Sequence, residues 1–302
     1  MSNYVENSGI KLNLDCYDGK DLYSDGDVED DILEIVGKTN DFAEIISQDD
    51  RWAVLYHLTD IRKNLLDWFP FEKESSLLEI GGGCGALTGL FCERVREVTS
   101  VEISMRRAKI ISTRHSNVRN LEIVVGNFEK IDFTKKYDYV TLIGVLEYAG
   151  SFISADNPYL SFLEKVKSLL KPDGKLLLAI ENKYGVKYFS GFAEDHTSKY
   201  FHGVEDYTGT TSVRTFSRNE MIKMFDSAGF KDVKCYYPCP DYKLPSIIFS
   251  DEYLPQNARD LPKSQNFDND RLELFSEKNA FEGIIRAGMF HDFANSFLFI
   301  AG

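Results

Sequence analysis

The sequence has no long run of apolar residues. No stretch approaches the roughly 18–20 apolar residues that a helix needs to cross a bilayer. The N-terminus has no basic region followed by an apolar segment, so no secretory leader is predicted. We therefore expect a cytoplasmic protein without a membrane span. The 302 residues, 43% of them hydrophobic, suffice for one large α/β domain with additions or for two small domains.

Cysteine is also scarce. The chain has five cysteines, an odd count without dense spacing, which argues against a disulfide framework. Cys235 and Cys239 form a close pair, but no second pair and no suitably spaced histidines accompany them, so no metal site is predicted. The remaining cysteines are Cys16, Cys84 and Cys92.

Basic residues are outnumbered by acidic ones. The chain has 35 Lys and Arg against 48 Asp and Glu, which gives a formal net charge of −13. Polyanions such as RNA and DNA are bound through surfaces rich in Lys and Arg. The balance therefore disfavours a nucleic-acid substrate, although a local basic patch would be compatible with one.

The sequence does contain a regular succession of apolar segments. Helical spacing is found at 28–48 and 50–68, after a polar lead-in at 1–27 for which we expect an extended or loosely ordered chain. From residue 76 onward, short apolar runs alternate with helical stretches, which indicates βαβ units. The expected strands are 77–80, 98–101, 121–125, 139–143, 175–180, 231–237 and 296–300.

This succession predicts an α/β fold with a Rossmann-like, seven-stranded, mostly parallel sheet and helices on both faces. We expect an N-terminal extension with a helical lid at 1–70 and a main domain at 71–302. Two insertions, at 182–213 and 238–290, interrupt that domain. Between them, Ser217 and Glu220 form the sequence pattern of a capping box at a helix start.

A glycine-rich turn, Gly81–Gly85, follows the first strand of the main domain and leads into a helix. Glycines adopt torsions closed to other residues and let a ligand approach the backbone, and a helix start offers N–H groups to it. Glu102 lies 21 residues after Gly81, at the end of the next strand, where a carboxylate can accept both hydroxyls of a ribose. The unit therefore predicts a nucleoside site.

Two nucleoside cofactors fit this turn. The spacing of Gly81, Gly83 and Ala86 also satisfies the dinucleotide fingerprint, so NAD is one candidate. Other features favour S-adenosylmethionine (SAM). Glu79 stands inside the strand, where dinucleotide folds usually keep an apolar residue, and the pair Asn127-Phe128 after the third strand suits the amine and the ring face of adenine.

These motifs together resemble the class I SAM-dependent methyltransferases. The resemblance implies that the turn holds the methionine part of SAM, that Glu102 binds the ribose, and that Asn127, where the family more often has Asp, accepts from the adenine amine. Gly144 and Tyr148 stand where many members have histidines. The implied cofactor-binding residues are Glu79, Gly81, Gly83, Gly85, Glu102, Ile103, Asn127, Phe128 and Gly144.

A narrower resemblance concerns four further segments. The segments 62–68, 180–188, 194–197 and 240–245 are similar to a bacterial group of methyltransferase domains found beside or fused to glycosyltransferases of surface polysaccharide assembly. This resemblance implies O-methylation of a sugar or glycan acceptor and a glycosyltransferase partner.

The candidate base is His196, because an imidazole takes up a proton near neutral pH. Asp195 beside it is expected to orient the ring. Glu147, after the fourth strand, could serve as the base or bind an amino group.

Two other functions stay open on the sequence. The segment 78–88 also looks like the rRNA adenine dimethylases, but the Asn-Leu-Pro-Tyr type of loop is replaced by Gly144–Glu147. A non-catalytic, cofactor-binding module that partners a glycosyltransferase would keep the same glycine turn and Glu102.

Overall fold

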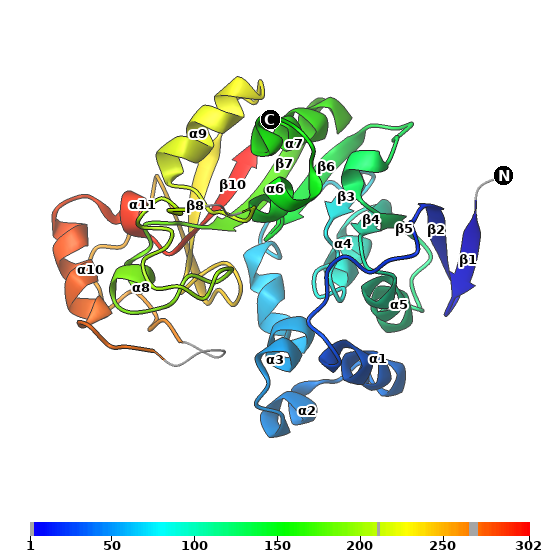
Figure 1. Cartoon of the computed structure of the whole chain (residues 1–302), viewed down its shortest axis with the longest axis horizontal. Helices are drawn as coiled ribbons and strands as arrows, with labels where there is room; N and C mark the ends of the chain where they lie inside the picture. The colour runs from blue at the N-terminus through cyan, green and yellow to red at the C-terminus, as the bar shows by residue number, and fades with distance from the viewer. Residues whose placement is uncertain (1–2, 210–211, 266–270) are drawn as a thin grey trace. The chain divides into compact units, whose positions relative to one another are not determined.

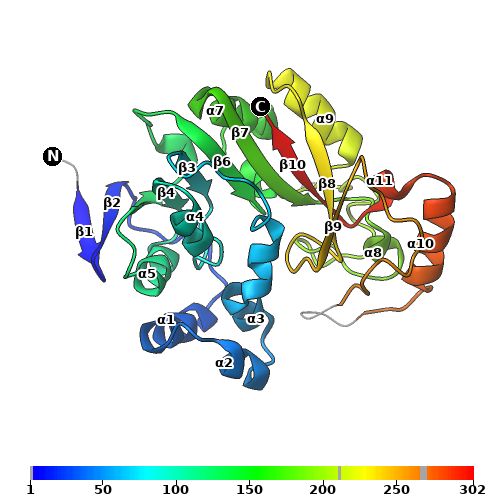
Figure 2. The same cartoon turned by 180° about the vertical axis from the view of Figure 1, so that it is seen from behind.

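The computed structural model describes residues 3–209, 212–265 and 271–302 (Figure 1, and from behind in Figure 2). The chain forms two compact units. Unit 1 comprises residues 1–142 and 169–174, and unit 2 comprises residues 143–168 and 175–302. Each expected insertion has residues outside the described part, namely 210–211 and 266–270. Within the described part, no helix combines the length and apolarity that crossing a membrane requires.

The centre of unit 1 is a parallel sheet. Strand β3 pairs in parallel with β4 on one side and with β6 on the other, and β4 pairs in parallel with β5. Every residue of β3 is buried, as expected for a central strand covered on both faces. The bounds are β3 Ser76–Ile80, β4 Glu97–Glu102, β5 Leu121–Gly126 and β6 Tyr137–Ile143.

The N-terminal lead-in differs from the sequence prediction. Instead of a loosely ordered chain, it forms a hairpin of β1, Tyr4–Asn7, and β2, Ile10–Cys16, and β2 then pairs in parallel with β5. Ser8 and Gly9 make the turn, with φ of +52° and +81°. Few residues of this hairpin are buried, so its apolar alternation is too weak to reveal a strand. The segment 1–70 is therefore not purely helical.

Four short helical elements follow the hairpin, where the sequence suggested two long ones. Thr39 is extended and ends α1, and Thr59 is extended and ends α3, with its hydroxyl accepting from the N–H of Ile61 at the start of η1. Helix α1 lies against α5, as Figure 1 shows. Helices α4 and α5 occupy the expected positions. The bounds are α1 Val28–Lys38, α2 Ala43–Gln48, α3 Trp52–Leu58, η1 Asp60–Leu65, α4 Thr88–Arg94, α5 Met105–Arg114 and η2 Phe128–Lys130.

Unit 2 is built on antiparallel strands. Its order is β7-β10-β8-β9, and β10 pairs antiparallel with both β7 and β8. Strand β9 and helix α10 lie within the expected insertion at 238–290. Because β1, β2 and β9 add to the seven predicted strands, the described residues form ten. The bounds are β7 Leu170–Glu181, β8 Lys234–Cys239, β9 Ile247–Ser250 and β10 Ser296–Ala301.

The helices of unit 2 include one whose start the sequence located correctly. Ser217 caps α9 by accepting from the N–H of Glu220, and the Glu220 carboxylate accepts from the N–H of Ser217 in return. The predicted capping box is thus confirmed. The bounds are η3 Leu146–Tyr148, α6 Ala149–Phe152, α7 Pro158–Leu169, α8 Val186–Phe189, α9 Arg218–Ser227, α10 Glu277–Arg286 and α11 Phe290–Phe293.

Candidate active site

The glycine turn of unit 1 is closed on one side and open on the other. A Cβ on Gly82 would clash with the Ser100 hydroxyl and would lie 2.9 Å from Ile111 Cδ1. Gly83 has φ of +56°, and a Cβ there would meet no atom within 4 Å. The turn therefore packs against β4 and α5 through Gly82 and presents the bare backbone of Gly83 to open space, as close approach by a ligand requires.

Glu102 is buried at the end of β4 and is joined to the turn. Its Oε2 accepts from the N–H of Gly83 at 2.8 Å, and its Oε1 accepts from the N–H of Ser104 at 3.0 Å. Burial raises the pKa of Glu102, while Arg107 and backbone N–H groups, those of Gly83 and Ser104 among them, oppose that rise. Each oxygen has a second lone pair, so the ribose contact that the sequence predicts is compatible with these bonds.

Glu79 lies beneath the turn. Its Oε2 accepts hydrogen bonds of 2.7 Å from the hydroxyls of Thr88 and Ser100, which ties β3 to the start of α4 and to β4. Burial raises the pKa of Glu79 to about 7, against the lowering effect of these two hydroxyls. Its predicted contact with the methionine part of SAM stays a prediction.

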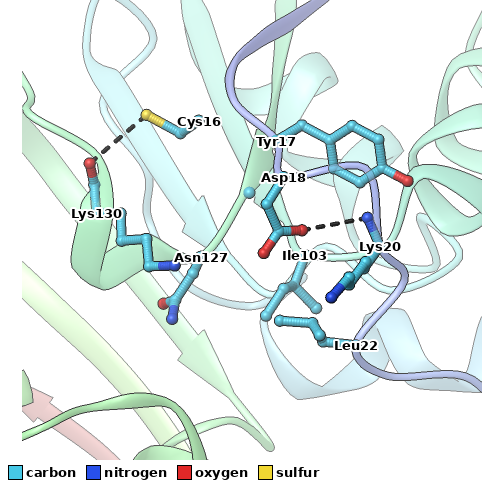
Figure 3. Close-up of a pocket in the computed structure, with 9 residues that line it drawn as sticks. Cys16, Tyr17, Asp18, Lys20, Leu22, Ile103, Asn127 and Lys130 are labelled. Carbon is cyan, nitrogen blue, oxygen red and sulfur yellow. Dashed lines mark hydrogen bonds between the residues drawn. The ribbon is translucent and has the colours of Figure 1, made fainter.

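A pocket of unit 1 contains two of the predicted cofactor-binding residues, Ile103 and Asn127 (Figure 3). The Asn127 Oδ1 accepts from the N–H of Glu129 at 3.0 Å. Phe128 does not line this pocket; its buried ring packs against Phe133, with centroids 5.6 Å apart. The other lining residues are Cys16, Tyr17, Asp18, Lys20, Leu22, Gly126 and Lys130.

The sequence prediction missed the contribution of residues 16–22 to this pocket. The segment is held in place by Asp21, whose carboxylate accepts from the backbone N–H groups of Met105 at 2.7 Å and Arg106 at 3.3 Å, at the start of α5. A carboxylate at this position also complements the positive end of the helix dipole. No apolar periodicity marks such a segment, so its place in the pocket could not be predicted from the sequence.

Gly144, the remaining predicted cofactor residue, belongs to unit 2. It has φ of +69°, and its N–H donates to the carbonyl of Ala179 at 2.9 Å. A Cβ there would lie 2.6 Å from the Tyr242 hydroxyl oxygen, so this glycine leaves room for Tyr242. Its contact with SAM stays a prediction.

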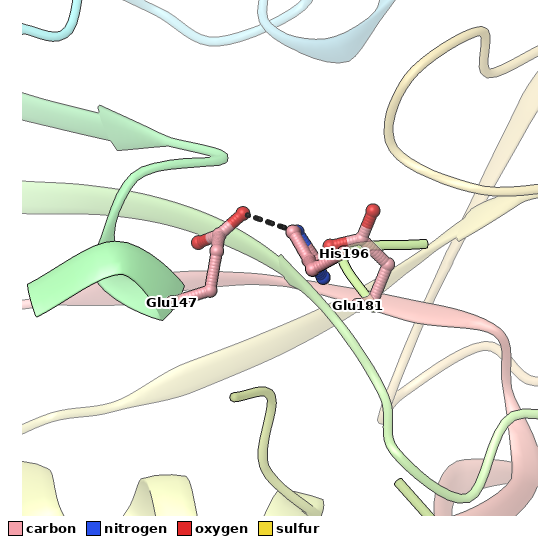
Figure 4. Close-up of side chains that lie close together, drawn as sticks. All are labelled: Glu147, Glu181 and His196. Carbon is pink, nitrogen blue, oxygen red and sulfur yellow. Dashed lines mark ion pairs between the residues drawn. The ribbon is translucent and has the colours of Figure 1, made fainter. Parts of the chain in front are cut away.

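Two of the predicted catalytic side chains meet in unit 2, together with a third that the sequence did not single out. Glu147 in η3 and Glu181 at the end of β7 are buried, and the side chain of His196, in the loop after α8, is 6% exposed. One ligand atom of each side chain lies within 4.8 Å of the others (Figure 4). The His196 Nε2 is 3.6 Å from Glu147 Oε1. The described structure thus brings an imidazole and two carboxylates together.

Asp195 does not orient His196, which corrects the sequence expectation. The His196 Nδ1 lies 3.0 Å from Glu194 Oε1, so Glu194 holds the ring. Asp195 instead bonds to the Tyr188 hydroxyl and to Lys243, and lies 3.0 Å from Lys187 Nζ. Both carboxylates precede the histidine, and only the loop conformation decides which one reaches it.

The protonation of the cluster follows from its burial and charges. Burial by itself lowers the pKa of His196, but hydrogen bonds to Glu147 and Glu194 and the charge of Glu181 outweigh it and raise that pKa well above 6.5. Burial also raises the pKa of Glu147, with His196 opposing and Glu181 adding to the rise. His196 is therefore a cation at neutral pH in this arrangement, which weakens its predicted role as a base.

Comparisons with known proteins agree with this geometry. A family model described as a methyltransferase domain matches residues 51–234. The ribosomal RNA small subunit methyltransferase A of Malacoplasma penetrans is 24% identical over 221 residues, 72% of this chain and 70% of that protein. The match to the protein of the same name from Borreliella afzelii covers only 28% of this chain and 29% of that protein, at 25% identity.

Solved structures of methyltransferases show partial similarity to this chain. A phosphoethanolamine N-methyltransferase of Haemonchus contortus, in complex with phosphoethanolamine and S-adenosylhomocysteine, has a TM-score of 0.49 and 17% identity, and the match covers 72% of this chain and 45% of that one. A SAM-dependent methyltransferase of Archaeoglobus fulgidus has a TM-score of 0.48 and 15% identity, with 83% and 99% covered.

The fold, the glycine turn and Glu102 define a class I SAM-dependent methyltransferase. The chain belongs to the methyltransferase-domain family whose model it matches over residues 51–234. The predicted enzyme class and the predicted cofactor, SAM, are thereby confirmed.

Proposed function

We propose that this enzyme transfers the methyl group of SAM to a hydroxyl group of a sugar or glycan acceptor in surface polysaccharide synthesis, in partnership with a glycosyltransferase. The supporting observation is that three of the segments with the narrower resemblance, at 180–188, 194–197 and 240–245, join in one network of buried and half-buried charged side chains. Lys243 lies 2.8 Å from Glu181 and also pairs with Asp195, and Lys187 lies 3.6 Å from Asp241. Segments that are distant in sequence thus build one polar centre.

The chemistry of this centre suits a hydroxyl-bearing acceptor. Carboxylate oxygens accept hydrogen bonds from hydroxyl groups, and Glu147 and Glu181 each keep an oxygen without a hydrogen-bond partner among the described residues. An excess of carboxylates repels phosphate groups. We propose that Glu147 and His196 contact the acceptor, and that alignment of acceptor and methyl donor supplies most of the rate enhancement.

Ribosomal RNA methylation is the second candidate, because the Malacoplasma penetrans relative carries that name. Two features argue against it: the net charge of −13, and the sequence Gly144–Glu147 after β6, where rRNA adenine dimethylases have the Asn-Leu-Pro-Tyr type of loop. A protein that binds RNA through Lys and Arg shows steep salt dependence. Salt-dependent binding of an rRNA fragment with methyl incorporation would favour this candidate over the glycan.

The test is a turnover assay with methyl-labelled SAM and separate panels of sugar nucleotides, oligosaccharides, amines and rRNA fragments. We expect label in a sugar, with an O-methyl signal in the NMR spectrum of the product. Glu147→Gln should lower kcat, whereas Glu205→Gln, at an exposed position in the same unit, should not. Label found only in amines or RNA would refute the proposal. SAM binding without transfer to any acceptor would instead support the non-catalytic module.

A further inference from the structure

In the cluster of Glu147, Glu181 and His196, some buried carboxylate oxygens are unsatisfied. The Oε2 atoms of Glu147 and Glu181 are buried and lack a hydrogen-bond partner among the described residues. Glu181 Oε1 lies 2.8 Å from Lys243 Nζ, and this ion pair does not involve Oε2. Buried carboxylate oxygens without partners are costly, so native structures rarely leave them in this state. Among the described residues, these two oxygen atoms therefore have no donor or cation bound to them.

The described side chains around them do not supply such a partner. Lys187 pairs with Asp195 and Asp241, and Lys243 divides its charge between Glu181 and Asp195. Two lysines and the His196 ring therefore face five carboxyl groups, so acceptor oxygens outnumber the cationic side chains that contact them. These carboxylates are Glu147, Glu181, Glu194, Asp195 and Asp241.

The orientation of His196 also matches a metal ligand. Its Nδ1 is held by the Glu194 carboxylate at 3.0 Å, which leaves Nε2 directed at Glu147. Metal-bound histidines usually donate their other ring N–H to a carboxylate in this way, which fixes the tautomer and the ring orientation. Glu194 is itself fixed, because its Oε2 accepts from the N–H groups of His196 at 2.9 Å and Thr197 at 2.7 Å.

We propose that unit 2 binds one divalent transition-metal ion through Glu147, Glu181 and His196, with Glu194 as a positioning residue. The sequence predicted no metal site, because its three ligands lie on separate elements without a spacing pattern. One nitrogen and two carboxylate groups form a mixed donor set that suits Mn²⁺, Fe²⁺ or Zn²⁺ better than Ca²⁺, which takes oxygen ligands. Three protein ligands leave coordination positions open for water or an acceptor hydroxyl.

The proposal is tested on the whole chain after treatment with EDTA. Titration with MnCl₂, followed by the electron paramagnetic resonance signal of free Mn²⁺, should give one bound ion per chain. Coupling of the bound Mn²⁺ to a ¹⁴N nucleus should identify an imidazole ligand and should disappear in His196→Gln. Glu194→Gln should lower the affinity by about 10–100-fold, as loss of such a supporting carboxylate typically does. Glu205→Gln serves as the matched surface control.

The result that would overturn the proposal is a chelated wild-type protein that binds no Mn²⁺, Zn²⁺ or Co²⁺ at millimolar concentration. Unchanged affinity in the double variant Glu147→Gln and Glu181→Gln would also overturn it, because the ion would then lie elsewhere. Circular dichroism and SAM binding show whether each variant is folded. Metal binding is measured without any acceptor, so a failure of the glycan assay leaves this result unaffected.

Discussion

The buried carboxyl group of Glu79 makes the stability of unit 1 depend on pH in a direction that can be worked out. Its pKa is about 7 in the folded chain and 4.5 in the reference state. Between pH 4.5 and pH 7, Glu79 therefore keeps its proton in the folded state but has lost it in the unfolded state. Stability from this group is fully present below pH 4.5 and is lost as the pH rises to 7. At about 1.4 kcal/mol per pKa unit, the loss is about 3 kcal/mol.

Glu79→Gln removes this titration while keeping a carbonyl oxygen for the hydroxyls of Thr88 and Ser100. We therefore expect the variant to gain about 3 kcal/mol relative to wild type between pH 4.5 and pH 8 in the SAM-free protein. The assay is urea unfolding at several pH values, followed by tryptophan fluorescence. Both tryptophans, Trp52 and Trp68, belong to unit 1, so the signal reports on that unit.

The control for this experiment is Glu74→Gln, at an exposed position just before β3. It should follow the wild-type pH dependence, because an exposed carboxyl group is solvated in both states. A difference between Glu79→Gln and wild type that is the same at pH 5 and pH 8 would refute the reasoning. It would mean that Glu79 titrates alike in the folded and unfolded chain.

Three further substitutions test the site. Gly83→Val should abolish SAM binding, because its side chain would fill the open face of the turn at φ +56°; wild-type affinity by calorimetry would contradict this. Asn127→Ala should weaken SAM binding by roughly 5–10-fold, the value of about one hydrogen bond, and an unchanged Kd would remove Asn127 from the adenine site. His196→Ala should lower kcat far more than SAM affinity, and unchanged turnover would exclude His196 from the reaction.

Local sequence patterns were sufficient for the features that depend on neighbouring residues. The apolar run before Gly81 predicted a strand, and β3 forms there and is buried throughout. Ser217 and Glu220 predicted a capping box, which forms because both partners lie within one helical turn. The turn at Gly81–Gly85 and the position of Glu102 predicted a nucleoside site, which the family comparison supports.

Contacts between distant segments could not be predicted in this way. The hairpin of β1 and β2 is stabilised by pairing with β5, more than 100 residues later, and its own apolar pattern is weak. Residues from 16 to 22 line the pocket that contains Asn127, and this too depends on contacts between segments that are distant in sequence.

The amino-acid sequence by itself determined the glycine turn, the strand before it and the residue types available for chemistry, because periodicity and torsion limits act over a few residues. Only the tertiary structure decided that Glu194 rather than Asp195 holds His196, and that Glu181 joins Glu147 beside that ring. The physical reason is that side-chain partnership depends on which distant backbones pack together, and burial there sets the charge that each group carries.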